Sequence, residues 1–93
     1  MNILITAGPT RAYIDEIRYI SNYSTGELAT HIANEAIKKG IKVTFIYGRG
    51  SLTPDKKKVK LIEIQTIKDL VWALKRELKK KYDAVIHSAA VLD

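Results

Sequence analysis

The chain has 93 residues, a formal net charge of +6 and no cysteine. It therefore forms one small domain at most, without a disulfide, a thiolate metal site or a cysteine nucleophile. The excess positive charge lies between Arg49 and Lys81, where eleven basic residues accompany four acidic ones. Few aromatic side chains are interleaved with these cations, as base stacking would require, so we expect a solvated basic surface and no nucleic-acid partner.

The first predicted element is a buried strand over residues 2–7, where three consecutive apolar residues precede Gly8-Pro9. This start lacks the basic segment of a secretion signal. No apolar stretch approaches the roughly 20 residues that span a bilayer, so we expect a cytoplasmic protein that does not contact a membrane. A long polar loop is predicted next, from Gly8 to about Tyr23.

A helix is predicted to follow this loop. Ser24-Thr25-Gly26-Glu27 fits a capping box, with Ser24 at the N-cap and Glu27 at the third helical position. The cations and glycine of Lys38-Lys39-Gly40 are typical of a helix end. The predicted buried face consists of apolar residues at helical spacing: Leu28, Ala29, Ile32, Ala33, Ala36 and Ile37.

The second half of the chain predicts strands over residues 42–47, 59–64 and 83–88. Between the last two strands, Thr66 is expected to cap a helix, with Asp69 at its third position. Trp72 lies off the apolar stripe of this helix, so we expect it at the edge of the domain. The predicted buried stripe is Ile67, Leu70, Val71, Leu74 and Leu78.

The order β-α-β-β-α-β, with helical crossovers, predicts an α/β fold with a Rossmann-like, three-layer open parallel sheet. The expected strand order is 3-2-1-4, with a switch point between the first and fourth strands. Ligands of such sheets bind beyond the carboxyl ends of the strands. Three segments are expected to meet there: Gly8–Thr10, Asn22–Gly26 and Ser88–Asp93.

The chemistry of these segments leaves alternatives open. A helix that starts near Ser24 and Gly26 suits a phosphate, but capping alone also explains these residues, and neither G-x-G-x-x-G nor a P-loop is present. Asn22 fits an oxyanion donor or an Asx-turn. Arg18 fits a phosphate or carboxylate partner, or an ion pair with its acidic neighbours. His87 fits a structural histidine or a ligand contact.

Three motifs, in order along the chain, resemble those of the phosphopantothenate–cysteine ligase family, also called phosphopantothenoylcysteine synthetase. Residues 5–11 read ITAGPTR, similar to the family's I-T-A-G-G/P-T-R. Residues 14–22 read IDEIRYISN, similar to I-D-P-V-R-Y/F-I-S-N, and residues 24–26 stand where the family has S-S-G or S-T-G. Residues 89–93 read AAVLD, similar to A-A-V-A/S-D. The resemblance spans the whole chain but only the N-terminal half of the family's ligase domain.

The resemblance implies a step of coenzyme A biosynthesis in which 4′-phosphopantothenate is joined to cysteine. CTP or ATP, with Mg²⁺, activates the carboxylate as an acyl-nucleotidylate, and the cysteine amine then attacks. The expected partners are these three small molecules and a second copy of the chain. A decarboxylase flavoprotein or a complementary chain is a further candidate partner.

The resemblance also implies roles for individual residues. Asn22 and Arg18 fall on catalytic positions, and Asn22 and Ala90 fall on the phosphopantothenate side. No protein metal ligand is implied. The implied nucleotide-binding residues are Gly8, Thr10, Ser24, Gly26, His87, Ser88, Ala89 and Asp93.

Several features depart from the family pattern, among them Glu16 in place of proline and the bulkier Leu92. Glu27 and Ala29 stand where many members have lysine and glycine, and the lysine of the family's lid would fall beyond Asp93. A nucleotide- or phosphopantothenate-binding module without catalysis is therefore the alternative to the ligase. An NAD(P) oxidoreductase is disfavoured, because the chain has neither the glycine fingerprint nor a Tyr-x-x-x-Lys pair.

Overall fold

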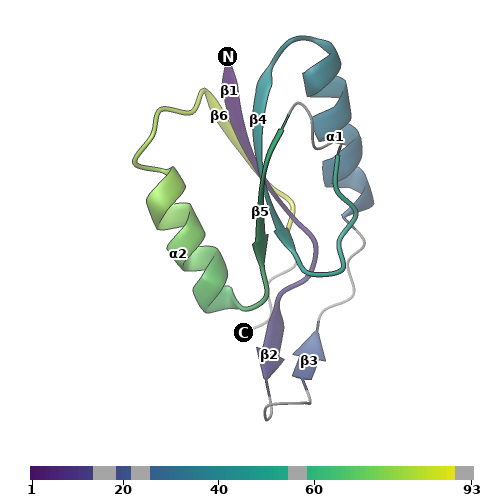
Figure 1. The fold of residues 1–93 in the computed structure, drawn as a ribbon, viewed down its shortest axis with the longest axis vertical. Helices are drawn as coiled ribbons and strands as arrows, with labels where there is room; N and C mark the ends of the chain where they lie inside the picture. Colours follow the sequence, from purple (N-terminus) through teal and green to yellow (C-terminus); the bar gives the residue numbers. More distant parts are fainter. Residues whose placement is uncertain (14–18, 22–25, 55–58, 90–93) are drawn as a thin grey trace.

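The computed structural model describes residues 1–13, 19–21, 26–54 and 59–89. Its centre is a four-stranded parallel sheet in the order β5-β4-β1-β6 (Figure 1). The predicted order 3-2-1-4 is thereby confirmed. The strands of the sheet are β1 (Asn2–Ala7), β4 (Lys42–Gly48), β5 (Val59–Ile64) and β6 (Ala84–His87).

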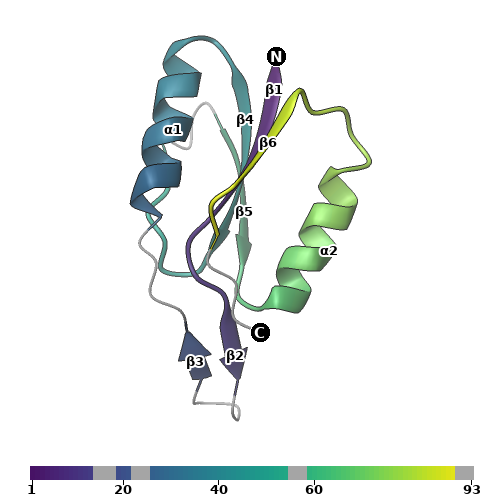
Figure 2. The ribbon, with the colours of Figure 1, turned by 180° about the vertical axis from the view of Figure 1, so that it is seen from behind.

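Two helices, α1 (Glu27–Lys38) and α2 (Ile67–Glu77), cover opposite faces of the sheet, as Figures 1 and 2 show. Successive side chains of β1 point to opposite faces of the sheet. The strand therefore contributes to two core clusters, one beneath each helix. Ile3 and Ile5 pack with the alanines of α1, and Leu4 packs with Leu70 and Ala73 of α2. The predicted three-layer arrangement is therefore confirmed.

The segment after β1 contains a hairpin that we did not predict. Strands β2 (Arg11–Tyr13) and β3 (Tyr19–Ser21) pair in antiparallel register, where we expected a polar loop. Tyrosine and isoleucine favour extended backbone, so Tyr13-Ile14 and Tyr19-Ile20 carried a signal for strands. The hairpin projects beyond the carboxyl ends of the parallel strands (Figure 1).

The prediction that Ser24 caps α1 was wrong. The N-cap is Gly26, with φ 73°, and no side chain caps the helix. Glu27 is therefore the first helical residue, not the third. The physical reason is the left-handed backbone at Gly26, a conformation that glycine adopts readily. The predicted end of the helix is confirmed, since the turn after Lys38 passes through Gly40 with φ 79°.

The capping box of α2 is confirmed. The Asp69 N–H donates to Thr66 Oγ1 at 3.2 Å, and the Thr66 N–H donates to Asp69 Oδ2 at 3.1 Å. These contacts, foremost the one from the Thr66 N–H, lower the pKa of Asp69. No helix in the described part of the chain is long and apolar enough to cross a membrane.

The predicted buried stripe of α2 was only partly right. The buried residues are Leu70, Ala73 and Glu77, whereas Val71 and Leu78 are exposed. In α1, likewise, Leu28 of the predicted stripe is exposed and the alanines form the contact. The buried face of α2 is therefore rotated, relative to the predicted stripe, so that it includes Glu77. The apolar side chains of Val71 and Leu78 are left exposed.

Candidate ligand-binding site at the carboxyl edge of the sheet

The predicted switch point lies between β1 and β6. From β1 the chain crosses through α1 to β4 on one side, while β6 pairs with the other side of β1. The chain leaves these two neighbouring strands at Gly8 and Ser88, and the Ser88 N–H donates to the Thr6 carbonyl at 2.9 Å. Diverging connections open a crevice at this point in α/β sheets.

Two glycines bring the backbone of three segments together at this edge. Gly8 and Gly26 both have left-handed backbone, with φ 78° and 73°. A Cβ on Gly8 would lie 2.5 Å from Ser51 Cβ, and a Cβ on Gly26 would overlap Ser51 Oγ. The turn after β1, the start of α1 and the loop after β4 are therefore in close contact, and side chains at the two glycine positions would separate them.

The loop after β4 is a part of the site that sequence reasoning missed. A Cβ on Gly48 would overlap the carbonyl of Pro9, so this loop packs directly against the turn after β1. The Ser51 hydroxyl donates to the Leu52 carbonyl at 2.9 Å. The signal was present in Gly48-Arg49-Gly50, because the turn that ends a central parallel strand lies at the same edge as its neighbours.

Thr6 is a second residue that the sequence did not single out. Its hydroxyl lies 2.6 Å from Nδ1 of His87, across the pairing of β1 with β6. Thr6 is fully buried and His87 is exposed. This contact occupies Nδ1 of His87. The tautomer of the ring then decides whether Nε2 donates or accepts a hydrogen bond.

The structure places six of the predicted site residues. Gly8, Thr10 and Gly26 are buried, and Ser88 and Ala89 are half-buried at the end of β6 beside His87. The Thr10 side chain is fully buried. The other predicted site residues lie outside the described part of the chain: Arg18, Asn22, Ser24, Ala90 and Asp93.

The start of α1 gives this edge its electrostatic character. The first turn of a helix presents free backbone N–H groups and a partial positive charge, which together attract anions. Gly26 and Gly8 are buried, and the space beside each is taken up by Ser51 of the loop after β4. Glu27 adds an exposed carboxylate at the first helical position, which repels an anion that binds on its side of the helix end.

The sequence comparisons identify the family. All 93 residues match the family described as the DNA/pantothenate metabolism flavoprotein C-terminal domain. The chain belongs to this family. It is 45% identical over 92 residues to the coenzyme A biosynthesis bifunctional protein CoaBC of Thermococcus kodakarensis, with 98% of this chain and 22% of the relative covered. The resemblance to the phosphopantothenate–cysteine ligase domain is therefore confirmed.

Solved structures share the fold of this chain. The DNA/pantothenate metabolism flavoprotein of Streptococcus pneumoniae superposes with a TM-score of 0.94 at 35% identity, covering 100% of this chain and 41% of that one. A Cab2 mutant in complex with phosphopantothenate-cysteine superposes with a TM-score of 0.87 at 21% identity, over 99% of this chain and 46% of that one, a likeness of fold alone. The chain thus spans about a fifth of its curated relative and less than half of the solved chains.

Proposed function

We propose that this chain forms the nucleotide-binding part of a phosphopantothenate–cysteine ligase. The observation that carries the proposal is the close contact of Gly8, Gly26 and Ser51 at the carboxyl edge of the sheet, beside the start of α1. That arrangement suits the phosphates of a nucleotide. Membership of the family supports the choice of reaction.

In the proposed reaction, a carboxylate oxygen of 4′-phosphopantothenate attacks the α-phosphorus of CTP or ATP, and pyrophosphate leaves. The cysteine amine then attacks the acyl carbon, an amide forms, and the nucleoside monophosphate departs as the amine loses its proton. Backbone N–H groups near Gly26 would bind the phosphates. The resemblance assigns the acyl group to Asn22 and Arg18, whose side chains supply an amide donor and a guanidinium for developing negative charge.

Mg²⁺ would accompany the nucleotide in this proposal. No group of three or more His, Asp or Glu residues that could hold a metal ion occurs among the described residues. The site around Gly8 and Gly26 offers backbone donors, which fits an ion carried by nucleotide phosphates and water, as Mg²⁺ commonly is. When bound, the ion would neutralise phosphate charge.

Two further parts of the proposal concern assembly and location. The resemblance implies a homodimer, with a decarboxylase flavoprotein or a complementary chain as a further candidate partner. A cytoplasmic location agrees with the small-molecule substrates of the proposed reaction. Because the solved relatives are more than twice as long, the remaining polypeptide of the domain is the first candidate for a complementary chain.

The test is release of pyrophosphate from CTP or ATP in the presence of 4′-phosphopantothenate, with and without cysteine. We expect release that depends on phosphopantothenate and is lost in Asn22→Ala, while nucleotide binding measured by calorimetry persists. The matched control is Asn34→Ala, a half-buried position on α1. Turnover that Asn22→Ala leaves unchanged would rule out the assigned role of that residue.

The alternative is a binding module without catalysis. It predicts binding of nucleotide or phosphopantothenate with no pyrophosphate release, and no release when the remaining polypeptide of a ligase domain is added. Release that appears only on that addition would support a ligase assembled from two chains. Absence of any nucleotide binding would contradict both.

A further inference from the structure

A hollow lies at the opposite end of the sheet from the candidate site. It has a volume of about 390 Å³ and is lined by the amino ends of β1, β4 and β5 and by the loop that follows α2. Such a volume lies at the lower end of the range for small-molecule sites. Its lining residues are Asn2, Lys42, Val43, Thr44, Val59, Lys60, Lys80, Lys81 and Tyr82.

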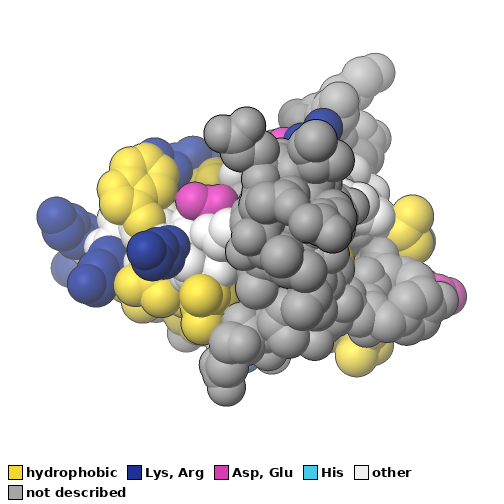
Figure 3. Space-filling model, turned by 90° about the horizontal axis from the view of Figure 1, so that it is seen from below, with side chains coloured by type: hydrophobic (Ala, Val, Ile, Leu, Met, Phe, Trp, Pro, Cys, Tyr) yellow, Lys and Arg dark blue, Asp and Glu magenta, His cyan; other side chains and the backbone are white. Residues whose placement is uncertain are grey.

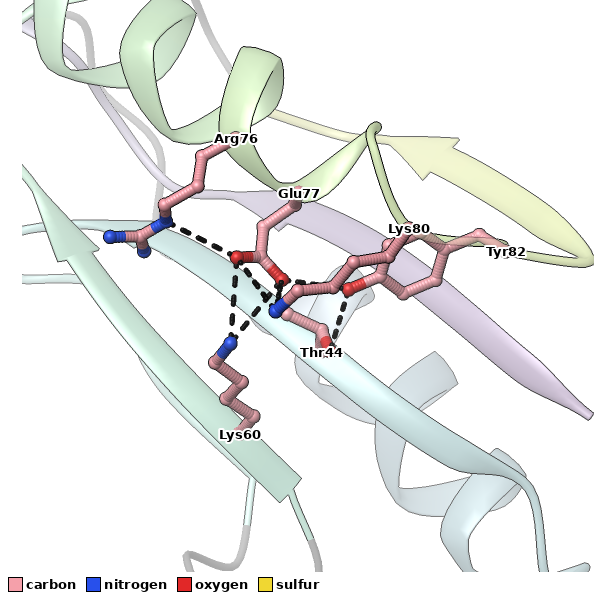
Figure 4. A network of polar contacts seen from close by, with 6 residues as sticks. All are labelled: Thr44, Lys60, Arg76, Glu77, Lys80 and Tyr82. Carbon is pink, nitrogen blue, oxygen red and sulfur yellow. Dashed lines mark hydrogen bonds and ion pairs between the residues drawn. The ribbon is translucent and has the colours of Figure 1, made fainter.

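A single buried carboxylate organises the cations beside this hollow (Figure 4). Glu77 is fully buried, and its oxygens lie 3.4 Å from Lys60 Nζ, 3.3 Å from Arg76 Nε and 3.2 Å from Lys80 Nζ. The Tyr82 hydroxyl donates to the same carboxylate at 2.9 Å and lies 3.1 Å from the Thr44 hydroxyl. One negative charge is therefore shared among three cations.

The cations around the hollow outnumber the carboxylates. Lys42 and Lys81 also line it, and neither forms an ion pair with any residue that the structure describes. The other nearby carboxylate, Asp83, accepts a hydrogen bond of 2.6 Å from the Asn2 N–H. Crowding is evident at Lys60, whose pKa is lowered foremost by its contact with Lys80.

We propose that this hollow is an anion-binding site, separate from the nucleotide site, that takes a compact oligophosphate group through Lys42, Lys60, Lys80 and Lys81. These lysines come from β4, from β5 and from the loop after α2. Because the four lysines line one hollow, we expect an anion with several charged oxygens to contact more of their ammonium groups than a single carboxylate does.

This site cannot share a ligand with the candidate nucleotide site. The hollow includes Asn2, at the start of β1, whereas Gly8 follows the end of that strand. A strand of six residues is about 20 Å long. One oligophosphate group does not reach both ends, so the two sites bind independently and are distinguished by mutation.

The probe is inorganic tripolyphosphate, titrated calorimetrically into the 93-residue chain at constant ionic strength, with NaCl as the blank. The test variant is K42Q/K81Q, because neither side chain takes part in the Glu77 network and we therefore expect the fold to be retained. The matched control is K38Q/K39Q, which removes two exposed lysines at the end of α1. We expect the test variant to weaken binding by roughly tenfold or more and the control to leave it within twofold.

Several results would overturn the proposal. Equal weakening in the two double variants would show diffuse attraction to a basic surface. Binding that K42Q/K81Q leaves intact and Gly26→Ala removes would place the probe at the nucleotide site. A duplex oligonucleotide that displaces tripolyphosphate at lower concentration, with the same dependence on Lys42 and Lys81, would make the hollow part of a nucleic-acid surface.

Discussion

Gly26 and Gly40 have almost the same backbone conformation in different surroundings. Their φ angles are 73° and 79°, but a Cβ on Gly26 would overlap Ser51 Oγ, whereas a Cβ on Gly40 would meet nothing within 4 Å. Gly40→Ala therefore measures left-handed strain alone, worth about 1 kcal/mol. We expect Gly26→Ala to lower the free energy of unfolding by more than this and to weaken nucleotide binding.

Urea unfolding of both variants and calorimetry with CTP and ATP provide the measurements. The prediction concerns the difference between the two variants, since each carries the backbone strain. Equal losses of stability, with nucleotide binding unchanged in Gly26→Ala, would mean that Ser51 moves aside and that the close approach of these segments is unimportant.

Glu77 makes the stability of the fold depend on pH. Burial raises its pKa, but the hydrogen bond from Tyr82 and the contacts with Lys80 and Lys60 outweigh burial and lower the pKa from 4.5 to about 2. A carboxylate with a lowered pKa stabilises the fold fully above its unfolded-state pKa, and the contribution is lost as the pH falls through the folded-state pKa. We therefore expect the Glu77 contribution, roughly 1–3 kcal/mol, to disappear between about pH 4.5 and pH 2.

Thermal unfolding between pH 7 and pH 2 checks this. Glu77→Gln should be less stable at pH 7 and should lose less stability than the native chain on acidification. Glu35→Gln is the matched control, because Glu35 is exposed and pairs only with Lys38, at 3.4 Å, in the described contacts. A native acid transition that Glu77→Gln leaves unchanged would contradict the assignment to Glu77.

At the scale of the element, the two helices begin in different ways. The start of α2 depends on the reciprocal contacts of Thr66 and Asp69, whereas α1 starts from a glycine without a side-chain cap. Thr66→Ala leaves the Asp69 N–H without its partner, and we expect a loss of about 1 kcal/mol. Thr66→Ser keeps the accepting oxygen and should cost less than half as much.

Chemical denaturation of the two Thr66 variants, with far-ultraviolet circular dichroism as the probe, measures this difference. Equal stability of Thr66→Ala and Thr66→Ser would show that the packing of α2, and not its cap, determines where the helix begins.

The elements that the sequence predicted correctly carry local signals. Three apolar residues in succession identify β1, and the pair Thr66 and Asp69 identifies the start of α2. The predicted start of α1 was wrong because two neighbouring signals were present. Ser24 fits an N-cap in the sequence, but Gly26 can adopt the left-handed backbone from which the helix starts. The sequence alone does not show which of the two residues is the N-cap. The buried face of α2 was predicted incorrectly because it includes Glu77. Burial of this carboxylate depends on cations from distant elements, Lys60 among them.

The same division holds for the candidate site. Gly8 and Gly26 were expected from motif resemblance, and the switch point was expected from strand order. Ser51 and Thr6 were missed, because their importance lies in contacts across the chain, with Gly26 and His87 respectively. The sequence does not reveal such contacts between distant residues. The turn predicted at Gly48-Arg49-Gly50, by contrast, indicated that the loop after β4 borders the site.

At the scale of the whole molecule, one corner of the part that the structure describes is uncovered. β6 is the last strand of the sheet, and Val85 pairs with Leu4, so it lies on the face that α2 covers elsewhere. Its exposed fraction is nonetheless 49%. Val71 of α2 and Leu78, its C-cap residue, are also exposed, at 43% and 53%. Figure 3 shows exposed hydrophobic side chains beside lysine and arginine on this side of the molecule.

The uncovered corner predicts how the 93-residue chain behaves alone. An apolar helix flank beside an unpaired edge strand favours association. A shallow apolar hollow of about 380 Å³, lined by Ile67, Lys68, Val71, Trp72 and Lys75, adds to this surface. We expect concentration-dependent self-association in sedimentation velocity, weakened at least several-fold by V71K/V85K. Lysine at these positions places charge on the apolar flank and beside the strand edge, which disfavours pairing.

Leu28→Lys is the control for this last experiment, because Leu28 is 66% exposed on α1, which covers the opposite face of the sheet. It removes a comparable apolar side chain without touching the corner between α2 and β6. If Leu28→Lys dissociates the assembly and V71K/V85K does not, the chains associate through α1, beside the candidate nucleotide site. Residues of two copies would then lie near each site, and titration of wild-type chain with an inactive variant would change nucleotide turnover.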